Sequence, residues 1–359
     1  MRLPKNRQIT IAEVAREAGV STQTVSRVVN NRQEISPETR QRVQEIIKRM
    51  RYHPNAIARS LSQRRTHTLG VAASGIEYYG PSRQLLGIEQ AANKLGYSII
   101  LNLIHRPEDG NVERVFRNLI SRQVEGIIWQ VPQIGDNHSW LRKEAQQLAT
   151  PVIFIDMQPY PQFNIITMDN RTGGRLATEH LLAQGYRQIG LISGPQNWWS
   201  AQERIRGWRE ALVAAGCPCE ERQMAEGDWT AGSGESGFKK LMDIFPEMEA
   251  VFVSNDQMAF GVYQAACQMG KCIPEDLAVV GFDDIPESGY FCPRLTTVRQ
   301  DLYELGNVAV QAFIDVHESE KSGEPASSSK NLVLQPQLIV RQSSIVDNQE
   351  RSISPVDKS

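Results

Sequence analysis

The chain has 359 residues, of which 40% are hydrophobic and 22% charged, a composition typical of a soluble globular protein with two or three domains. It has no apolar run of membrane-spanning length and no secretory signal, so we expect no membrane partner and a cytoplasmic location. The five cysteines are odd in number and lack ligand spacing, so we expect no disulfide, no metal site and no cofactor.

Charge is distributed unevenly along the chain. Residues 1–65 contain 14 Lys and Arg against five Asp and Glu, a net charge of +9, and the remainder carries −11, against −2 for the whole chain. Such an asymmetry indicates that only the N-terminal segment meets phosphate. A solvated basic face is the alternative, but the basic segment coincides with a pair of predicted helices.

The first predicted elements are two short helices joined by a turn. Thr10 and Glu13 have the spacing of a capping box, Gly19 suits a tight turn, and Ser21 can cap the second helix. This pattern is typical of a helix-turn-helix, whose second helix lies in the DNA major groove, although any helical hairpin joined by glycine has a similar pattern. The open face of the second helix carries Thr22, Gln23, Ser26 and Arg27.

A third helix and a linker follow. Ser36 and Pro37 predict a helix start, and apolar residues at three-to-four spacing up to Met50 can close a small core. Residues 55–62 could form one or two helical turns, too few to be stable alone. We expect this segment to become helical only against a partner; a flexible linker is the alternative.

From Thr66 onward, short apolar runs alternate with helical patterns. Strands that are buried on both faces and alternate with helices predict parallel sheets. A Gly-x3-Ala-x4-Gly pattern recurs three times, starting at Gly87, Gly207 and Gly261, which indicates repeated βα units and two similar α/β halves. Such sheets bind ligands at the carboxyl ends of their strands.

Several polar residues stand directly after predicted strands. Asp156, Asn255 and Asp283 could hold hydroxyl groups, and Arg204 and Trp229 add hydrogen-bond donors and a flat apolar surface. This set describes a sugar site better than a catalytic one; helix capping is the alternative for Asp and Asn. No nucleophile, metal or phosphate-loop motif is present, so we expect that the protein is not an enzyme. Asp283 and Asp284 are the alternative, as a carboxylate pair for general acid–base catalysis.

Taken together, these motifs resemble the LacI/GalR family of bacterial transcriptional repressors. The resemblance runs from about residue 9 to about 343 and rests on residues 14–30, 52–58, 80–82, 227–229, 254–259, 280–284 and 295–301. It implies an all-α helix-turn-helix head and hinge helix joined to a two-lobed α/β core like a periplasmic binding protein. The expected domains are 1–53 for DNA binding, 54–66 for hinge and linker, 67–343 for the core, and 344–359 for a polar tail. Within the core we expect an N-lobe of about 67–167 and 299–327 and a C-lobe of about 168–298 and 328–343.

The resemblance also assigns roles to residues. The expected DNA contacts are Thr22, Gln23, Ser26, Arg27 and Asn30 in the recognition helix, and Asn55, Ala58 and Leu61 in the hinge. Arg and Gln suit bidentate contacts with guanine and adenine, and an apolar side chain such as Leu61 can wedge into a base step.

The ligand contacts implied by the family fall on Asp156, Ser200, Arg204, Trp229, Asn255, Asp283 and Gln300. Tyr78, Gln130 and Met168 stand where a lactose-responsive member has Leu, Asn and Phe, and Trp129, Trp198 and Trp199 add bulk near the site. The resemblance implies a sugar or glycoside, with galactosides the leading expectation, and a second ring or aglycone recognised differently.

We therefore expect a repressor of operator DNA whose affinity is lowered by a sugar inducer in the inter-lobe cleft. Two alternatives remain: a corepressor that tightens DNA binding, and a sugar receptor without a DNA role. The tail is polar, contains Pro355 and lacks the leucine heptads of a tetramerising member, so we expect a homodimer.

Overall fold

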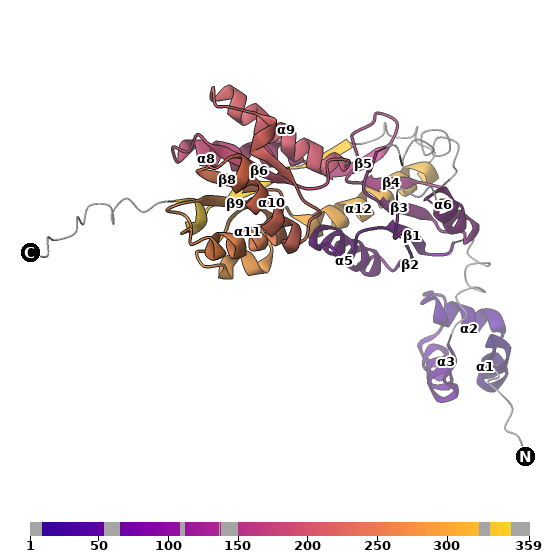
Figure 1. Cartoon of the computed structure of the whole chain (residues 1–359). Helices are drawn as coiled ribbons and strands as arrows, with labels where there is room; N and C mark the ends of the chain where they lie inside the picture. Colours follow the sequence, from indigo (N-terminus) through magenta and orange to yellow (C-terminus); the bar gives the residue numbers. More distant parts are fainter. Residues whose placement is uncertain are drawn as a thin grey trace, which may run out of the picture. The chain divides into compact units, whose positions relative to one another are not determined.

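The computed structural model describes residues 9–53, 65–107, 112–135, 137, 150–322 and 331–345, and it divides into two compact units, Met1–His67 and Thr68–Ser359 (Figure 1). Each unit has its own hydrophobic core. The hinge prediction for residues 54–64 lies outside the described residues. No helix in the described ranges is long and apolar enough to cross a membrane.

The N-terminal unit consists of three helices: α1 (Ile11–Ala18), α2 (Thr22–Val29) and α3 (Pro37–Met50). The predicted caps are all present. Thr10 and Glu13 form a reciprocal capping box, Gly19 adopts φ +64°, and the Ser21 hydroxyl accepts a hydrogen bond from the Thr24 amide at 3.1 Å. Val14, Val25 and Val43, one from each helix, meet in the core at 0% exposure.

The second unit contains two six-stranded sheets, one in each lobe. Parallel pairing dominates, and the antiparallel exception is β10 with β12. The N-lobe sheet has the order β11 (Asn331–Leu334), β5 (Asn164–Met168), β4 (Val152–Ile155), β3 (Gly126–Gln130), β1 (Thr68–Ala73), β2 (Ser98–Leu103). The C-lobe sheet has the order β12 (Gln337–Ile339), β10 (Thr296–Arg299), β9 (Ala278–Asp283), β8 (Ala250–Val253), β6 (Ile189–Ser193), β7 (Met224–Glu226).

Helices cover the two sheets in closely packed pairs, of which α5 and α12 lie side by side in Figure 1. The N-lobe has α5 (Tyr79–Lys94), α6 (Val112–Ser121) and α12 (Leu302–Ser322). The C-lobe has α8 (Asn170–Ala183), α9 (Trp199–Ala214), α10 (Ala231–Ile244) and α11 (Asp256–Gln268), with 3₁₀ turns η2 (Glu221–Gln223), η3 (Pro286–Tyr290) and η4 (Gln342–Ser344).

The repeated glycine pattern explains this pairing. A Cβ on Gly87, Gly207 or Gly261 would lie 1.9–2.1 Å from a backbone carbonyl oxygen of the neighbouring helix, so each glycine permits close helix–helix contact. The glycine that closes each pattern has φ between +66° and +76°, as expected where a helix stops.

One predicted boundary is wrong. We expected residues 328–343 to belong to the C-lobe, but β11 pairs with β5 in the N-lobe sheet, with Asn331 opposite Ile165. The chain returns to the C-lobe only between Leu334 and Gln337, where β12 begins. An edge strand of this kind can extend the edge of either sheet, and its short apolar run carries no signal of which one.

Candidate functional site

The recognition helix α2 presents the predicted polar face to solvent. Thr22, Gln23 and Arg27 are exposed and Ser26 is half-buried, whereas Val25 and Val28 are buried. Asn30 caps the helix, and its side-chain amide donates to the Ser26 hydroxyl at 3.3 Å.

Arg27 lies 3.6 Å from the Glu34 carboxylate in an exposed pair, so its guanidinium stays accessible. The other three predicted contacts, Asn55, Ala58 and Leu61, lie outside the described residues.

A cleft of about 760 Å³, including its open mouth, lies between the two lobes of the core. Its mixed polar and apolar lining is typical of a small-molecule site. Nine of the ten predicted ligand residues line it: Tyr78, Gln130, Asp156, Ser200, Arg204, Trp229, Asn255, Asp283 and Gln300. The structure therefore brings together residues that are up to 222 positions apart in the sequence.

The tenth residue, Met168, does not reach the cleft. Its side chain is 1% exposed and packs in the core between the N-lobe sheet and α12. Alternate residues of a strand point to opposite faces, and Met168, the last residue of β5, points into the core. Trp129 is likewise fully buried, with its ring 5.7 Å from that of Phe116, so the expectation that it adds bulk to the site is also wrong.

On the N-lobe side, Asp156 is held by a chain of amides. The Gln84 side-chain amide donates to Asp156 Oδ2, and Gln130 Nε2 donates to Gln84 Oε1 at 3.0 Å and to the Pro81 carbonyl at 2.7 Å. Asp156 has φ +52°, which turns its side chain out of the strand direction at a cost in backbone energy. Burial raises the pKa of the Asp156 carboxyl, while the Gln84 hydrogen bond opposes that shift.

On the C-lobe side, Arg204 is buried but makes its hydrogen bonds to neutral acceptors. Its Nε donates to Asn170 Oδ1 at 2.9 Å and its Nη1 to the Ser254 carbonyl. The guanidinium lies 3.8 Å from the Phe282 ring centroid and 5.5 Å from that of Trp229. Burial lowers the pKa of Arg204, and the nearby carboxylates oppose that shift. Arg204 therefore offers a positive charge beside the Phe282 and Trp229 rings.

Asp283 and Gln300 form the third polar group. Gln300 Nε2 donates to Asp283 Oδ1 at 2.7 Å, and burial raises the pKa of Asp283 to about 6. Asn255 fulfils both interpretations that the sequence left open: it caps α11 through the Met258 amide, lines the cleft, and donates to the Trp229 carbonyl at 3.0 Å.

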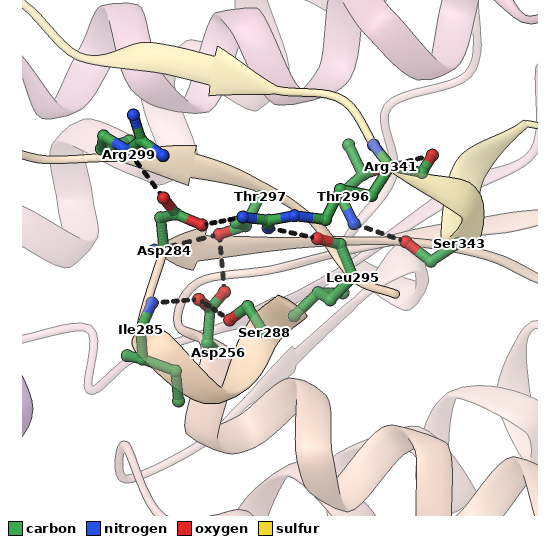
Figure 2. Close-up of polar contacts among 10 residues, drawn as sticks. All are labelled: Asp256, Asp284, Ile285, Ser288, Leu295, Thr296, Thr297, Arg299, Arg341 and Ser343. Atoms are coloured by element: carbon green, nitrogen blue, oxygen red, sulfur yellow. Dashed lines mark hydrogen bonds and ion pairs between the residues drawn. The ribbon is translucent and has the colours of Figure 1, made fainter. Parts of the chain in front are cut away.

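Asp284 turns away from the cleft into a structural network (Figure 2). Its carboxylate accepts from Arg341 Nη2 and Arg299 Nε, both at 2.6 Å. Nearby, the fully buried Asp256 accepts from the Ile285 amide and from the Ser288 and Thr297 hydroxyls. Asp284 is therefore engaged by arginines, which makes Asp283 and Asp284 unsuitable as a cooperating acid–base pair.

Sequence reasoning missed some of the lining. Gln84 lies within α5, where no local pattern marked it. Asn170 begins α8 two residues after β5 ends, a strand end that the sequence analysis did not single out. Further lining residues not singled out are Ser74, Tyr79, Gln133, Gln257 and Leu302.

Comparisons with known proteins agree with this architecture. Residues 10–55 match the model of bacterial regulatory proteins, lacI family, and residues 178–344 match a periplasmic binding protein-like domain. The chain is 33% identical to the lactose operon repressor of Escherichia coli K12, over 95% of this chain and 92% of that protein. It belongs to the LacI family. The ribose operon repressor of E. coli K12, another LacI-family relative, is 34% identical over 92% of this chain and 98% of its own.

Solved structures of the LacI family superpose over nearly the whole chain. A lac repressor dimer bound to operator and the anti-inducer ONPF has a TM-score of 0.84 at 32% identity, covering 95% of this chain and all of that one. A complex of the transcriptional regulator CelR with cellobiose has a TM-score of 0.69 at 30% identity, covering 94% of this chain and all of that one.

Proposed function

We propose that this LacI-family protein is a homodimeric repressor that binds operator DNA and is released when a sugar or glycoside enters the cleft between its lobes. The observation that carries the proposal is the convergence of nine predicted ligand residues on one cleft, in a chain that also has a separately folded, basic helix-turn-helix unit. The proposed domains are residues 1–53 for DNA binding, 54–66 for the hinge and linker, 67–343 for effector binding and dimerisation, and 344–359 for a polar tail. We place its action in the bacterial cytoplasm, on the nucleoid.

DNA recognition is assigned to the exposed face of α2. Gln23 and Arg27 would make bidentate contacts with bases, while Thr22, Ser26 and Asn30 contact base edges or phosphate. Asn55, Ala58 and Leu61 would act in the minor groove. An Arg27→Ala variant should lose more affinity for operator than for random DNA, and equal losses on both would contradict a base-reading role.

The effector is assigned to the hydroxyl-rich, neutral class of ligands. Asp156, Asp283 and Asn255 offer acceptors and amides for hydroxyl groups, Arg204 offers donors, and Trp229 offers a flat apolar face. Relatives include a ribose operon repressor and a regulator solved with cellobiose, so the choice among sugars is open to a screen. We put galactosides first in that screen.

Homodimerisation is supported by exposed apolar side chains on both lobes. Leu101 and Leu103 on the edge strand β2 are 42% and 38% exposed, and Phe260 and Tyr290 on the C-lobe are 58% and 89% exposed. We assign these side chains to the dimer interface, because burying apolar surface favours association and a two-fold dimer matches a palindromic operator.

An operator mobility-shift titration with glycosides tests the proposal. We expect a galactoside or related sugar to lower operator affinity, and by linkage operator must weaken sugar binding by the same factor. A ligand that tightens operator binding would identify a corepressor instead. Sugar binding without any operator binding would identify a receptor, and an unchanged shift with every ligand would refute the inducer role.

A further inference from the structure

The cleft has an aromatic wall built from both lobes. Trp198 of the C-lobe packs edge-on against Tyr78 of the N-lobe, with ring centroids 6.2 Å apart, and against Trp229 at 5.8 Å. All three line the cleft; Trp229 is buried, whereas Tyr78 and Trp198 are half-buried. The outer part of the wall, Tyr78 and Trp198, is therefore accessible apolar surface.

Trp198 is held in place by a backbone latch between the lobes, which we define as residues 133–135 and 197–199. Ile134 and Trp198 form an isolated antiparallel bridge. On either side of it, the Trp199 amide donates to the Gln133 carbonyl at 3.0 Å and the Gly135 amide donates to the Asn197 carbonyl at 3.1 Å. Because these contacts use backbone atoms, they fix the position of the Trp198 ring without depending on its side chain.

Polar and apolar groups are separated within the cleft. The groups suited to a first sugar ring are Asp156, Arg204 and Asp283. Arg204 and Asp283 are 7% and 8% exposed, and Asp156 is half-buried. Beside them, the Trp229 indole Nε1 is buried and has no hydrogen-bond partner within the part of the chain that the structure describes. A buried donor without a partner is costly, and a ligand hydroxyl or ring oxygen would satisfy it.

The Trp198 side chain has one N–H donor and a large apolar face, so it offers little to the hydroxyl groups of a first ring. The latch nevertheless places this residue in the lining of the same cleft. Pyranose and aryl rings present flat apolar faces that pack well on such side chains.

We propose that Trp198 is a specificity-determining residue that selects an effector with a second ring, such as a disaccharide or aryl glycoside. The inference rests on the proposed sugar site and deepens it. The first ring occupies the polar region, and the second ring packs on Trp198 next to Tyr78. Because Trp198 lies within the latch, the second ring contacts both lobes where they meet, and its occupancy is coupled to lobe arrangement.

Consecutive tryptophans provide a matched test. Trp199 adjoins Trp198 and contributes to the latch only through its backbone amide, which alanine retains. Its side chain lines a separate outer groove with Gln158, Asn197 and Gln202. Trp198→Ala, Trp198→Phe and Trp199→Ala should be compared with wild type by calorimetric titration of the full-length protein. The probes are galactose with lactose and phenyl-galactoside, and glucose with cellobiose and phenyl-glucoside.

We expect Trp198→Ala to weaken the two-ring probes by about tenfold, the loss expected for one aromatic contact and its buried area, and the monosaccharides by less than about threefold. Trp198→Phe should recover part of the loss, and Trp199→Ala should bind all probes like wild type. Equal losses for one-ring and two-ring probes, or an equal effect of Trp199→Ala, would overturn this inference and leave the proposed function intact. If wild type binds none of a wider set of sugars, the proposed function itself fails.

Discussion

Replacing Asp256 by asparagine should make the protein more stable than wild type at neutral pH, and by much less at acidic pH. Asp256 Oδ2 accepts from the Ile285 amide and the Ser288 hydroxyl, and Oδ1 accepts from the Thr297 hydroxyl at 2.6 Å. An asparagine can keep this geometry, with its carbonyl at the first two donors and its amide donating to Thr297. The substitution therefore removes a titrating group with little change in packing.

The magnitude follows from the pKa. Burial, with a smaller contribution from the nearby Asp283, raises the pKa of Asp256 to about 7 from an ordinary value of 3.8. Between these values the unfolded chain releases a proton that the folded protein keeps. The contribution of Asp256 to the free energy of unfolding is therefore fully present at low pH and is lost as pH rises toward 7. A difference of about 3 units corresponds to at most about 4 kcal/mol.

Urea unfolding at pH 5 and pH 8 tests this expectation. All six tryptophans lie in the second unit, so tryptophan fluorescence reports on the core alone. The free energy of unfolding of Asp256→Asn, minus that of wild type, should be larger at pH 8 than at pH 5. The exposed Asp243→Asn serves as the control for the loss of a carboxylate. Parallel stability profiles for wild type and Asp256→Asn would refute the reasoning.

Three further substitutions test particular contacts. A Cβ on Gly194 would lie 2.0 Å from the Trp229 ring, so Gly194→Ala should weaken effector binding by about 1–3 kcal/mol in a calorimetric titration. Gly261→Ala would place a Cβ 1.9 Å from the Ala231 carbonyl oxygen and should lower the free energy of unfolding in urea by about 1–3 kcal/mol. Ser21→Ala removes the cap of α2, costs about 1 kcal/mol, and should speed amide hydrogen exchange in the first turn of that helix. Unchanged affinity, unfolding midpoint or exchange rate, respectively, would contradict each expectation.

Strand ends were the sequence signal that located the cleft. Asp156 and Asn255 each follow a buried apolar run, and Asp283 ends one; parallel strands that lie in one sheet deliver such residues to the same edge. The helix-turn-helix was equally accessible, because capping residues such as Thr10 and Ser21 act within three or four positions of the chain.

Other parts of the site depended on tertiary contacts that no local pattern encodes. Gln84 reaches the cleft because α5 is placed by its packing partners, and helix periodicity alone does not give the position of a helix axis. Met168 was expected in the cleft, but the face to which a strand residue points depends on register. The latch joins residues 133–135 to residues 197–199, two segments that no pattern in the sequence pairs with each other.

The late return of the chain to the C-lobe has a consequence for biosynthesis. β12 completes the C-lobe sheet beside β10, and Ser343 Oγ donates to the Val279 carbonyl at 2.6 Å while accepting from the Thr296 amide. A ribosome adds these residues long after the basic three-helix unit, whose last helix ends at Met50. Because domains fold as units during synthesis, a nascent chain has a folded helix-turn-helix well before it can respond to an effector. Premature termination near residue 335 would leave the helix-turn-helix intact beside a C-lobe sheet that lacks its edge strand β12.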